Sequence, residues 1–396
     1  MKILMINVTC GVGSTGRICT DIAAELEKLG HEVKIAYGRD MVLQEHQKYA
    51  VRIGNNIEIK LHALASRIFD NAGFGSKFAT KKFLKWAEEY NPDIIHLHNI
   101  HGYYINIELL FNYIKKANKK VIWTLHDCWA FTGHCTHFDY FGCEKWKKQC
   151  YSCEQLKEYP KSVFCDNSKK NYKKKKELFS DVPNMMLVVP SEWLSGVVKQ
   201  GFMGQYPVRV IPNGIDLSIF KPTESDIRQR YALQDKKILL GVSSVWTKKK
   251  GFYDFIELSK LISDDYRIVL VGVTDEQVKV LPQNVIGISR TNSITELCKW
   301  YTAADLFINP SVEETMGLTT AEALACGTPV IVYNRTAVPE VPDEKCGIVL
   351  KNNMPQEIFR CVIKCSFESA DCIERARNFE KKNKYQEYIN LYGLDK

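Results

Sequence analysis

The sequence predicts an α/β protein with two Rossmann-like domains that face a central cleft. Short β-rich runs alternate with amphipathic helical segments, a pattern typical of parallel sheets built from βαβ units. The alternation starts again after Pro212-Asn213-Gly214, and 396 residues exceed what one ordinary hydrophobic core contains. We therefore expect an N-terminal domain over 1–205, a C-terminal domain over 206–374, and a helical segment over 375–396 that packs back on the core.

In the N-terminal domain, a strand at Lys2–Val8 leads through a glycine-rich turn into a helix at Arg17–Leu29. Apolar residues recur every three or four positions along this helix, and Gly30 ends it. The other strands predicted for this half are Val33–Tyr37, Ile94–Leu97, Val121–Leu125 and Met186–Val189.

The C-terminal domain repeats this order of elements. A last amphipathic helix is predicted over Arg375–Tyr392, with aromatic residues on one face. The strands predicted for this half are Ile238–Val242, Arg267–Val271, Val285–Ile288, Leu306–Asn309 and Val330–Tyr333.

The composition excludes several classes of protein. Hydrophobic residues make up 45% and charged residues 25%, as in soluble globular proteins, which excludes a disordered, collagen-like or coiled-coil chain. The apolar runs are far shorter than the ~20 residues of a membrane span. The net charge of +8 is small for a nucleic-acid-binding protein. This small charge predicts that the protein binds no nucleic acid. Lys2–Val8 is too short for the apolar part of a signal peptide, so we expect a cytoplasmic protein.

Gly11-Val12-Gly13-Ser14-Thr15-Gly16 is a G-x-G-x-x-G pattern between the first strand and the first helix. Glycines let the backbone approach a phosphate closely, and a helix N-terminus offers free amides and the positive end of its dipole. A dinucleotide-binding fold also needs an acidic residue at the end of the second strand. This chain has Tyr37 and Gly38 there, and Asp40 comes too late. The loop therefore favours phosphate binding over NAD binding, and a tight turn without a ligand is the alternative.

The region around residues 311–331 combines acidic residues with a second predicted helix start. A strand leads into a loop with Glu314 and Gly317, and a helix beginning near Leu318 carries Glu322. Thr319-Thr320 can cap this helix. Carboxylates accept hydrogen bonds from vicinal hydroxyls, so two acids beside a phosphate-binding helix end suit a sugar and a ribose. Two solvated glutamates are the alternative for either acid taken alone.

These motifs resemble the retaining GT-B glycosyltransferases of family 4, also called glycosyl transferases group 1, whose E-x7-E signature corresponds to Glu314 and Glu322. The resemblance covers nearly the whole chain. The Cys-rich insert at 128–165 resembles a subgroup found in bacterial capsule and exopolysaccharide clusters. The further motifs in family order are Gly30-His31-Glu32-Val33, Thr124-Leu125-His126-Asp127, Pro212-Asn213-Gly214-Ile215-Asp216 and Lys250-Gly251.

The resemblance implies a donor site in the C-terminal domain. Glu322 would hold the ribose hydroxyls of the nucleotide, and Glu314 would contact the donor sugar as a catalytic residue. Lys250 would also be catalytic, because it would balance the charge that develops on the diphosphate leaving group. The amides implied in diphosphate binding belong to Met316, Gly317, Leu318 and Thr319.

The resemblance also implies roles in the N-terminal domain. Gly13 and Ser14 match the pair at the helix start that binds the donor phosphate. His126 matches a catalytic histidine that contacts the donor sugar, and Arg17 would face the acceptor.

The chain departs from the family at one point of the donor site. The family often has an arginine five or six positions before the lysine corresponding to Lys250, and this chain has Val245 and Ser244 there. Lys248 or Lys249 could supply the second positive charge, or Lys250 could act alone. Such enzymes generally need no divalent ion, so we expect no required cofactor.

Cysteines gather in the insert after His126, and cysteine clusters in cytoplasmic proteins bind metals more often than they form disulfides. Cys150 and Cys153 have the C-x2-C spacing, and Cys135 and Cys143 could complete a structural zinc site of four thiolates. Buried reduced thiols are the alternative, and the insert's aromatic residues could instead line the acceptor groove. His134 and His137 are expected to be ordinary side chains unless the zinc is real.

The basic run Lys169–Lys176 reads KKNYKKKK and is most simply a solvated helix face. The alternative is attraction to anionic lipid headgroups, about 1 kcal/mol per basic residue near the surface. A polyprenyl-diphosphate-linked acceptor would place the enzyme at the inner face of the plasma membrane.

We therefore expect a glycosyltransferase of the hexosyltransferase type, which moves a sugar with retention from a UDP- or GDP-sugar to a glycan or lipid-linked acceptor in bacterial surface polysaccharide synthesis. A non-catalytic sugar-nucleotide-binding partner subunit is one alternative. A nucleotide-sugar epimerase of the same architecture is another, and an NAD oxidoreductase comes last.

Overall fold

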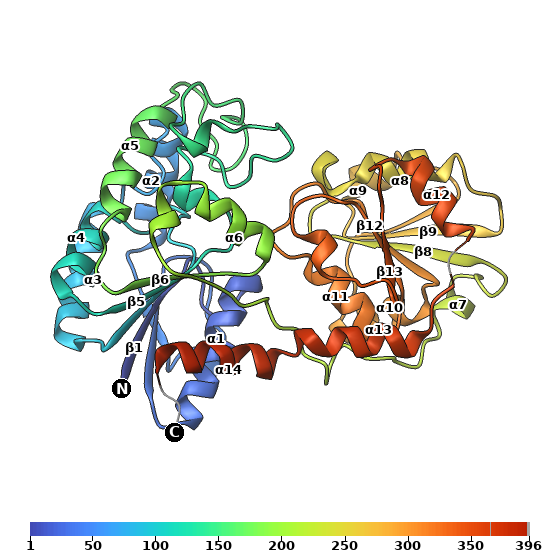
Figure 1. Cartoon of the computed structure of the whole chain (residues 1–396), viewed down its shortest axis with the longest axis horizontal. Helices are drawn as coiled ribbons and strands as arrows, with labels where there is room; N and C mark the ends of the chain where they lie inside the picture. Colours follow the sequence, from blue (N-terminus) through green and yellow to red (C-terminus); the bar gives the residue numbers. More distant parts are fainter. Residues whose placement is uncertain (365, 394–396) are drawn as a thin grey trace. The chain divides into compact units, whose positions relative to one another are not determined.

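The computed structural model describes residues 1–364 and 366–393. They form two compact units, one made of Met1–Ile211 with the chain from Tyr385, the other of Pro212–Lys384. Each unit contains one parallel sheet with helices on both faces (Figure 1). The predicted α/β fold with two Rossmann-like domains is confirmed. None of the helices in the described part of the chain is both long and apolar enough to cross a lipid bilayer.

The N-terminal unit has a seven-stranded parallel sheet in the order β3-β2-β1-β4-β5-β6-β7. Its strands are β1 (Lys2–Ile6), β2 (Glu32–Tyr37), β3 (Ala50–Arg52), β4 (Ile94–Leu97), β5 (Lys120–Thr124), β6 (Met185–Val189) and β7 (Val208–Val210). Its helices are α1 (Gly13–Lys28), α2 (Asn56–Phe69), α3 (Lys77–Tyr90), α4 (Ile107–Ala117), α5 (Ser168–Phe179) and α6 (Glu192–Lys199), and most of α14 (Lys381–Tyr392) joins them.

Alternating side chains of β1 divide the core of this unit between the two faces of the sheet. Ile3 and Met5 pack with apolar residues of α1 and α14. Leu4 and Ile6 pack on the other side with residues of α3, α4 and α6. Successive residues of a strand point to opposite faces, so a strand covered on both sides must be apolar throughout, as the predicted strands are. Figure 1 shows α14 beside α1 on one face of this sheet.

The C-terminal unit has a six-stranded parallel sheet in the order β10-β9-β8-β11-β12-β13. Its strands are β8 (Lys237–Val242), β9 (Tyr266–Val271), β10 (Val285–Ile288), β11 (Leu306–Asn309), β12 (Val330–Val332) and β13 (Gly347–Val349). Its helices are α7 (Ile227–Arg230), α8 (Phe252–Ser259), α9 (Asp275–Val278), α10 (Ile294–Ala303), α11 (Leu318–Ala325), α12 (Pro355–Val362) and α13 (Ser369–Ala376). Apolar residues of α10, α11 and α13 cover one face and those of α8 and α12 the other.

The predicted C-terminal helix over Arg375–Tyr392 is wrong as a single element. The chain forms α13, a short 3-10 turn and then α14. Glu380 forms a parallel bridge with Ile215, whose amide donates to the Phe379 carbonyl at 2.8 Å and whose carbonyl accepts from the Lys381 amide at 2.9 Å. Backbone groups bonded to Ile215 cannot continue a helix, which explains the break.

Candidate functional site

The loop after β11 and the start of α11 form the centre of the candidate site in the C-terminal unit. Gly317 is the N-cap of α11 with φ of 96°, a backbone conformation that favours glycine. The expected capping by Thr319-Thr320 is wrong, because no side chain caps this helix. Thr320 is buried and its hydroxyl accepts a hydrogen bond from Asn309 Nδ2 at 2.9 Å, which ties the helix to the end of β11. The first amides of an α-helix lack an intrahelical acceptor, and in α11 these belong to Leu318 and Thr319.

Lys250 lies beside Glu314 in this loop. The Lys250 ammonium is 2.5 Å from Glu314 Oε1 and 3.3 Å from the Glu313 carbonyl oxygen, to which it also donates. Both side chains are partly exposed, so the pair remains accessible to a ligand. The Glu314 backbone is also held, because its amide donates to Thr336 Oγ1 at 3.1 Å. The structure thus brings together two residues that the sequence placed 64 positions apart.

Lys249 forms a second ion pair next to the first. Its ammonium is 3.0 Å from Glu313 Oε2, and the Glu313 side chain is only 4% exposed. A buried carboxylate needs a partner charge, so Lys249 has a structural task here. Lys248, the other lysine that could replace the family's arginine, is exposed. Ser244 and Val245, which occupy the positions of that arginine, are exposed as well.

Glu322 lies in the second turn of α11, partly buried. Tyr301 on α10 donates a hydrogen bond from its hydroxyl to Glu322 Oε2 at 2.9 Å. Burial and the nearby Glu322 charge raise the pKa of Tyr301 well above its usual value, so the tyrosine remains a donor. Tyr301 was missed in the sequence, because no local pattern marks the contact between two helices. Met316 is buried, and its sulfur accepts from the Asn213 amide at 3.1 Å.

The glycine-rich loop of the N-terminal unit leads from β1 into α1. Gly13 and Ser14 are exposed residues in the first turn of α1, and Arg17 is exposed on the next turn. The Gly11 amide donates to the Gly16 carbonyl at 3.1 Å, which closes the loop on itself. A Cβ added at Gly16 would lie 2.6 Å from the Thr9 hydroxyl, so this position needs glycine.

His126 follows β5 and shares a hydrogen bond of 3.0 Å with His98, which follows β4. The two rings are stacked with centroids 5.3 Å apart. Burial lowers the pKa of His126 to about 4 and that of His98 well below its usual value. Both imidazoles are therefore neutral at pH 7, and His98 fixes the direction in which the His126 ring points.

A second polar cluster, missed in the sequence, lies next to His126. His101 is 2.8 Å from Asp127 Oδ2 through Nε2 and 3.1 Å from the Tyr159 hydroxyl through Nδ1. Burial by itself would raise the pKa of Asp127, but the neighbouring His101 lowers it to about 2. Asp127 also accepts a hydrogen bond from the Trp129 amide at 2.8 Å, so it anchors the start of the insert. The signal available in the sequence was the group of histidines at 96, 98 and 101, within and just after β4.

The structure groups the predicted residues by unit. Within the C-terminal unit, Lys250 contacts Glu314, and Glu322 lies one helical turn beyond Leu318. Within the N-terminal unit, the residues of the glycine loop and His126 follow β1 and β5, and parallel strands end at one edge of their sheet. The predicted thiol cluster lies in the insert between β5 and α5.

Two family models match most of the chain. The model described as "Glycosyltransferase Family 4" matches residues 15–219, and the one described as "Glycosyl transferases group 1" matches residues 236–366. A relative from Escherichia coli (strain K12), "Putative colanic acid biosynthesis glycosyl transferase WcaC", is 24% identical over 99% of both chains. An "Uncharacterized 41.2 kDa protein in cps region" of Klebsiella pneumoniae is 25% identical over 77% of this chain and 80% of its own length.

Solved structures share the fold along the whole chain. Sucrose-phosphate synthase from Thermosynechococcus elongatus matches with a TM-score of 0.72 and 17% identity, over 99% of this chain and 98% of its own. Anabaena HepE in complex with UDP matches with a TM-score of 0.68 and 15% identity, over 99% of this chain and 100% of its own. The same protein was also solved with UDP-glucose. The chain therefore has the GT-B fold and belongs to glycosyltransferase family 4.

Proposed function

We propose that this protein is a retaining glycosyltransferase that transfers a hexose-type sugar from a UDP- or GDP-sugar to a glycan or polyprenyl-diphosphate-linked acceptor in bacterial surface polysaccharide synthesis. The observation that carries the proposal is the contact between Lys250 and Glu314 at the start of α11, with Glu322 further along the same helix. The relatives named for colanic acid biosynthesis and a cps region support the polysaccharide context. The neighbours that bind UDP and UDP-glucose support the donor class.

The donor diphosphate would bind at the N-terminus of α11. The amides of Leu318 and Thr319 and the positive end of the helix dipole favour an anion there. The ion pair with Glu314 holds the Lys250 ammonium in place. A bound diphosphate would compete with the Glu314 carboxylate for this ammonium. As the sugar–phosphate bond breaks, negative charge grows on the leaving group, and Lys250 would stabilise it.

Sugar hydroxyls would be bound by carboxylates and by the neutral His126. Glu314 would accept hydrogen bonds from the donor sugar, and Glu322 from the ribose. His126, held by His98 at 3.0 Å, would contact the donor sugar without adding a charge to the site. Retention would follow from front-face attack, with the departing phosphate taking the proton of the acceptor hydroxyl.

The test begins with the nucleotide. Thermal shift with UDP, GDP, ADP, CMP and NAD should show stabilisation by one nucleoside diphosphate, and Glu322→Ala should abolish it. Stabilisation by NAD alone, or by none of the five, would overturn the proposed donor class.

Incubation with the matching nucleotide sugars then separates the functions. Release of nucleotide and transfer of sugar to an acceptor support the transferase, and NMR of the product's anomeric proton tests retention. Conversion of the donor sugar without an acceptor would identify an epimerase. Nucleotide binding without any turnover would identify a non-catalytic partner subunit.

The expectation that the basic run Lys169–Lys176 forms an exposed helix face is wrong for one of its lysines, which weakens the case for membrane contact through this run. Lys175 is buried, and its ammonium donates to the carbonyls of Trp129 at 2.7 Å and Thr132 at 3.1 Å. It also lies 3.4 Å from the centroid of the Trp129 ring. This lysine therefore anchors α5 under the insert, whereas its neighbours Lys173 and Lys176 are exposed.

A better candidate for lipid contact is the outer face of α2. Ile57, Leu61 and Leu64 are 71%, 59% and 53% exposed, and their spacing places them on one face of the helix. Among the residues of α2 only His62 and Ser66 are buried. α2 and the next helix, α3, also carry exposed basic side chains, which suit an anionic membrane surface. They are Lys60, Arg67, Lys77, Lys81, Lys82 and Lys85.

Vesicle sedimentation tests this contact. The protein should sediment with vesicles containing phosphatidylglycerol and less with phosphatidylcholine vesicles. The double variant Leu61→Asp/Leu64→Asp should lose this binding, while Val280→Asp, an exposed apolar position of the other unit, should keep it. Equal binding of both variants would remove α2 from the proposal.

A further inference from the structure

The insert between β5 and α5 is a long segment with little regular structure. From Leu125 to Asn167 it contains only two short 3-10 helices, Trp129–Phe131 and Lys145–Lys147. Long irregular segments inside a compact domain are uncommon and need other interactions to hold them. The insert contains six cysteines, none of them in a disulfide.

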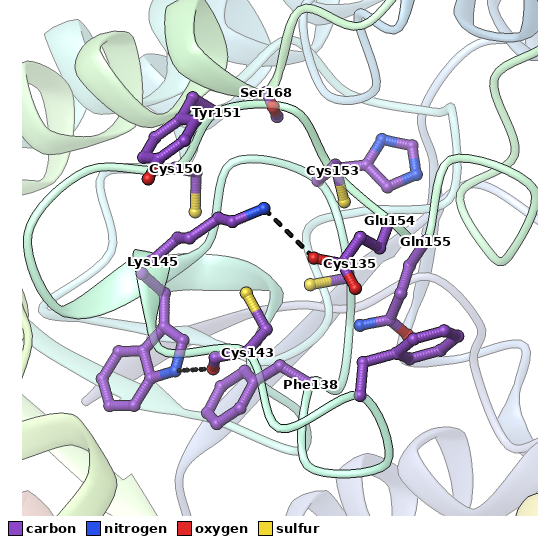
Figure 2. A pocket seen from close by; sticks show the side chains of 13 residues that line it. Cys135, Phe138, Cys143, Lys145, Cys150, Tyr151, Cys153, Glu154, Gln155 and Ser168 are labelled. Carbon is purple, nitrogen blue, oxygen red and sulfur yellow. Dashed lines mark hydrogen bonds and ion pairs between the residues drawn. The ribbon is translucent and has the colours of Figure 1, made fainter.

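Four of these cysteines line one small cavity. The cavity has a volume of about 20 Å³, roughly enough for one water molecule, and its walls include Phe138 and Trp146. Figure 2 shows the sulfur atoms of the four cysteines turned toward the same space from different turns of the insert. They are Cys135, Cys143, Cys150 and Cys153, the four that the sequence singled out.

The thiols also interact with one another and with the backbone. Cys135 and Cys153 share a hydrogen bond between their sulfur groups. Cys150 lies close enough to Cys143 for an electrostatic interaction, and its sulfur accepts a hydrogen bond from the Gly133 amide at 3.2 Å. Amides that donate to sulfur stabilise thiolates, which is the form in which cysteine binds a metal.

A second and independent feature of the cavity is His134. Its side chain is 2% exposed and lines the cavity, and Nε2 has no hydrogen-bond partner within the described residues. Its Nδ1 is 2.5 Å from the buried Asp70 Oδ1, which fixes the ring. Leaving a buried polar atom without a partner costs about 1–3 kcal/mol. Because Nδ1 donates to the Asp70 carboxylate, Nε2 offers a lone pair, the form in which histidine binds a metal ion or accepts a hydrogen bond.

Positive charge is available to balance such a centre. Burial lowers the pKa of Lys175 to about 7, and its electrostatic interaction with the nearby Cys150 and Cys135 opposes this and favours the charged form. Lys145 lines the cavity itself. Four thiolates around a divalent ion carry a net charge of −2, which would be unfavourable in an apolar cavity without nearby cations.

We propose that this cavity is a structural zinc site with Cys135, Cys143, Cys150 and Cys153 as its ligands. In the part of the chain that the structure describes, no three Cys, His, Asp or Glu side chains are yet grouped so that they could hold an ion. Ligation therefore requires the thiol side chains to move closer together within the cavity. Each of the four thiols gives up its proton to solvent, and the zinc ion binds the four sulfurs tetrahedrally. The metal would hold the insert together next to His126, and it would take no part in sugar transfer.

Metal analysis of the untagged full-length protein, purified without chelators, tests the site. We expect about one zinc per chain, as for a closed four-ligand site. The double variant Cys150→Ser/Cys153→Ser should lose nearly all of it. Cys361→Ser, which changes a partly buried cysteine of α12 in the other unit, is the matched control and should keep it.

A second measurement uses only the wild-type protein, so its result does not depend on whether the double variant folds. Titration of the folded wild-type protein with a mercurial reagent should release zinc, detected with a metallochromic dye, in step with modification of the insert thiols. Wild-type protein that stays metal-free after zinc incubation would overturn the proposal, as would a Cys135–Cys153 disulfide found by mass spectrometry. These readouts are independent of turnover, so their failure leaves the proposed transferase function standing.

Discussion

The Lys250 ammonium lies 2.5 Å from the Glu314 carboxylate at the start of α11. The next lysine along the chain, Lys249, is held by the buried Glu313 at 3.0 Å. Two adjacent lysines thus bind two adjacent glutamates, but only one pair is accessible. The pair formed by Lys249 and Glu313 fastens the loop, and the pair formed by Lys250 and Glu314 can open to a ligand.

Replacement of Lys250 should therefore abolish most of the turnover. Lys250→Ala removes the cation that would stabilise the leaving diphosphate, and we expect kcat to fall by about 10²–10³-fold. The protein should remain folded, because the Lys250 side chain is partly exposed. Steady-state kinetics with the nucleotide sugar identified by thermal shift provides the measurement.

Lys260→Ala is the matched control, because Lys260 forms an exposed ion pair with Glu257 at the end of α8. This variant should retain wild-type kcat. An unchanged kcat in Lys250→Ala would show that the diphosphate charge is balanced elsewhere, with Lys248 as the next residue to test.

Nucleotide affinity should depend on both Glu322 and Tyr301. Glu322→Ala removes the proposed acceptor for the ribose hydroxyls. Tyr301→Phe removes the hydroxyl that holds Glu322 Oε2 at 2.9 Å, and we expect affinity to fall by about 5-fold for a hydrogen bond of ~1 kcal/mol. Titration calorimetry with the nucleoside diphosphate measures both.

Tyr333→Phe is the control for this pair. It also removes a hydroxyl that donates to a carboxylate, Asp254 Oδ1 at 2.8 Å, but outside the proposed ribose site. Equal losses of affinity in Tyr301→Phe and Tyr333→Phe would mean that general destabilisation, and not the ribose contact, explains the result.

The main sheets could be predicted from the sequence because their strands are covered on both faces. Such strands are mostly apolar and buried, and Ile94–Leu97 and Leu306–Asn309 were predicted with the bounds that the structure has. The edge strands β3 and β7 have three residues each and include the exposed Arg52 and Arg209, so they gave no apolar run. The break before α14 depends on Ile215, 165 positions before its partner Glu380, and no local pattern encodes it.

The candidate site was predictable to the extent that its residues follow strand ends. Glu314 and Glu322 were found by their spacing around a helix start. Contacts between distant elements were not, such as that of Tyr301 with Glu322. Lys175 is the opposite case, because the run of lysines indicated exposure while carbonyls of the insert bury its ammonium.

His126 should affect turnover more than binding. His126→Ala removes a neutral imidazole proposed to contact the donor sugar, so we expect kcat to fall by at least about 10²-fold while nucleotide affinity changes little. His98→Ala, which removes the hydrogen bond that orients the His126 ring, should give a smaller loss of kcat. A loss of nucleotide affinity as large as that in Glu322→Ala would contradict the assignment.

Buried histidines should make the N-terminal unit sensitive to acid. His62 accepts a hydrogen bond from the Gly75 amide at Nε2, and its Nδ1 is 2.9 Å from the Ser76 hydroxyl, so the ring is neutral. Burial lowers the pKa of His62 from 6.5 to about 4. The unfolded chain therefore binds more protons than the folded one between these values, and the free energy of unfolding falls as the pH drops below about 6.5. At pH 5 the cost is about 2 kcal/mol for this residue, relative to pH 8.

Urea unfolding at pH 8 and pH 5 measures this effect. His62→Gln removes the titrating group, so the loss of unfolding free energy between the two pH values should shrink by about 2 kcal/mol. His46→Gln is the control, because His46 is more exposed than His62 and lies outside the buried set. It should leave the pH dependence close to that of the wild type. If His62→Gln kept the full wild-type dependence, the acid sensitivity would have to come from other groups, and two other histidines whose pKa burial lowers, His96 and His98, would be the next to replace.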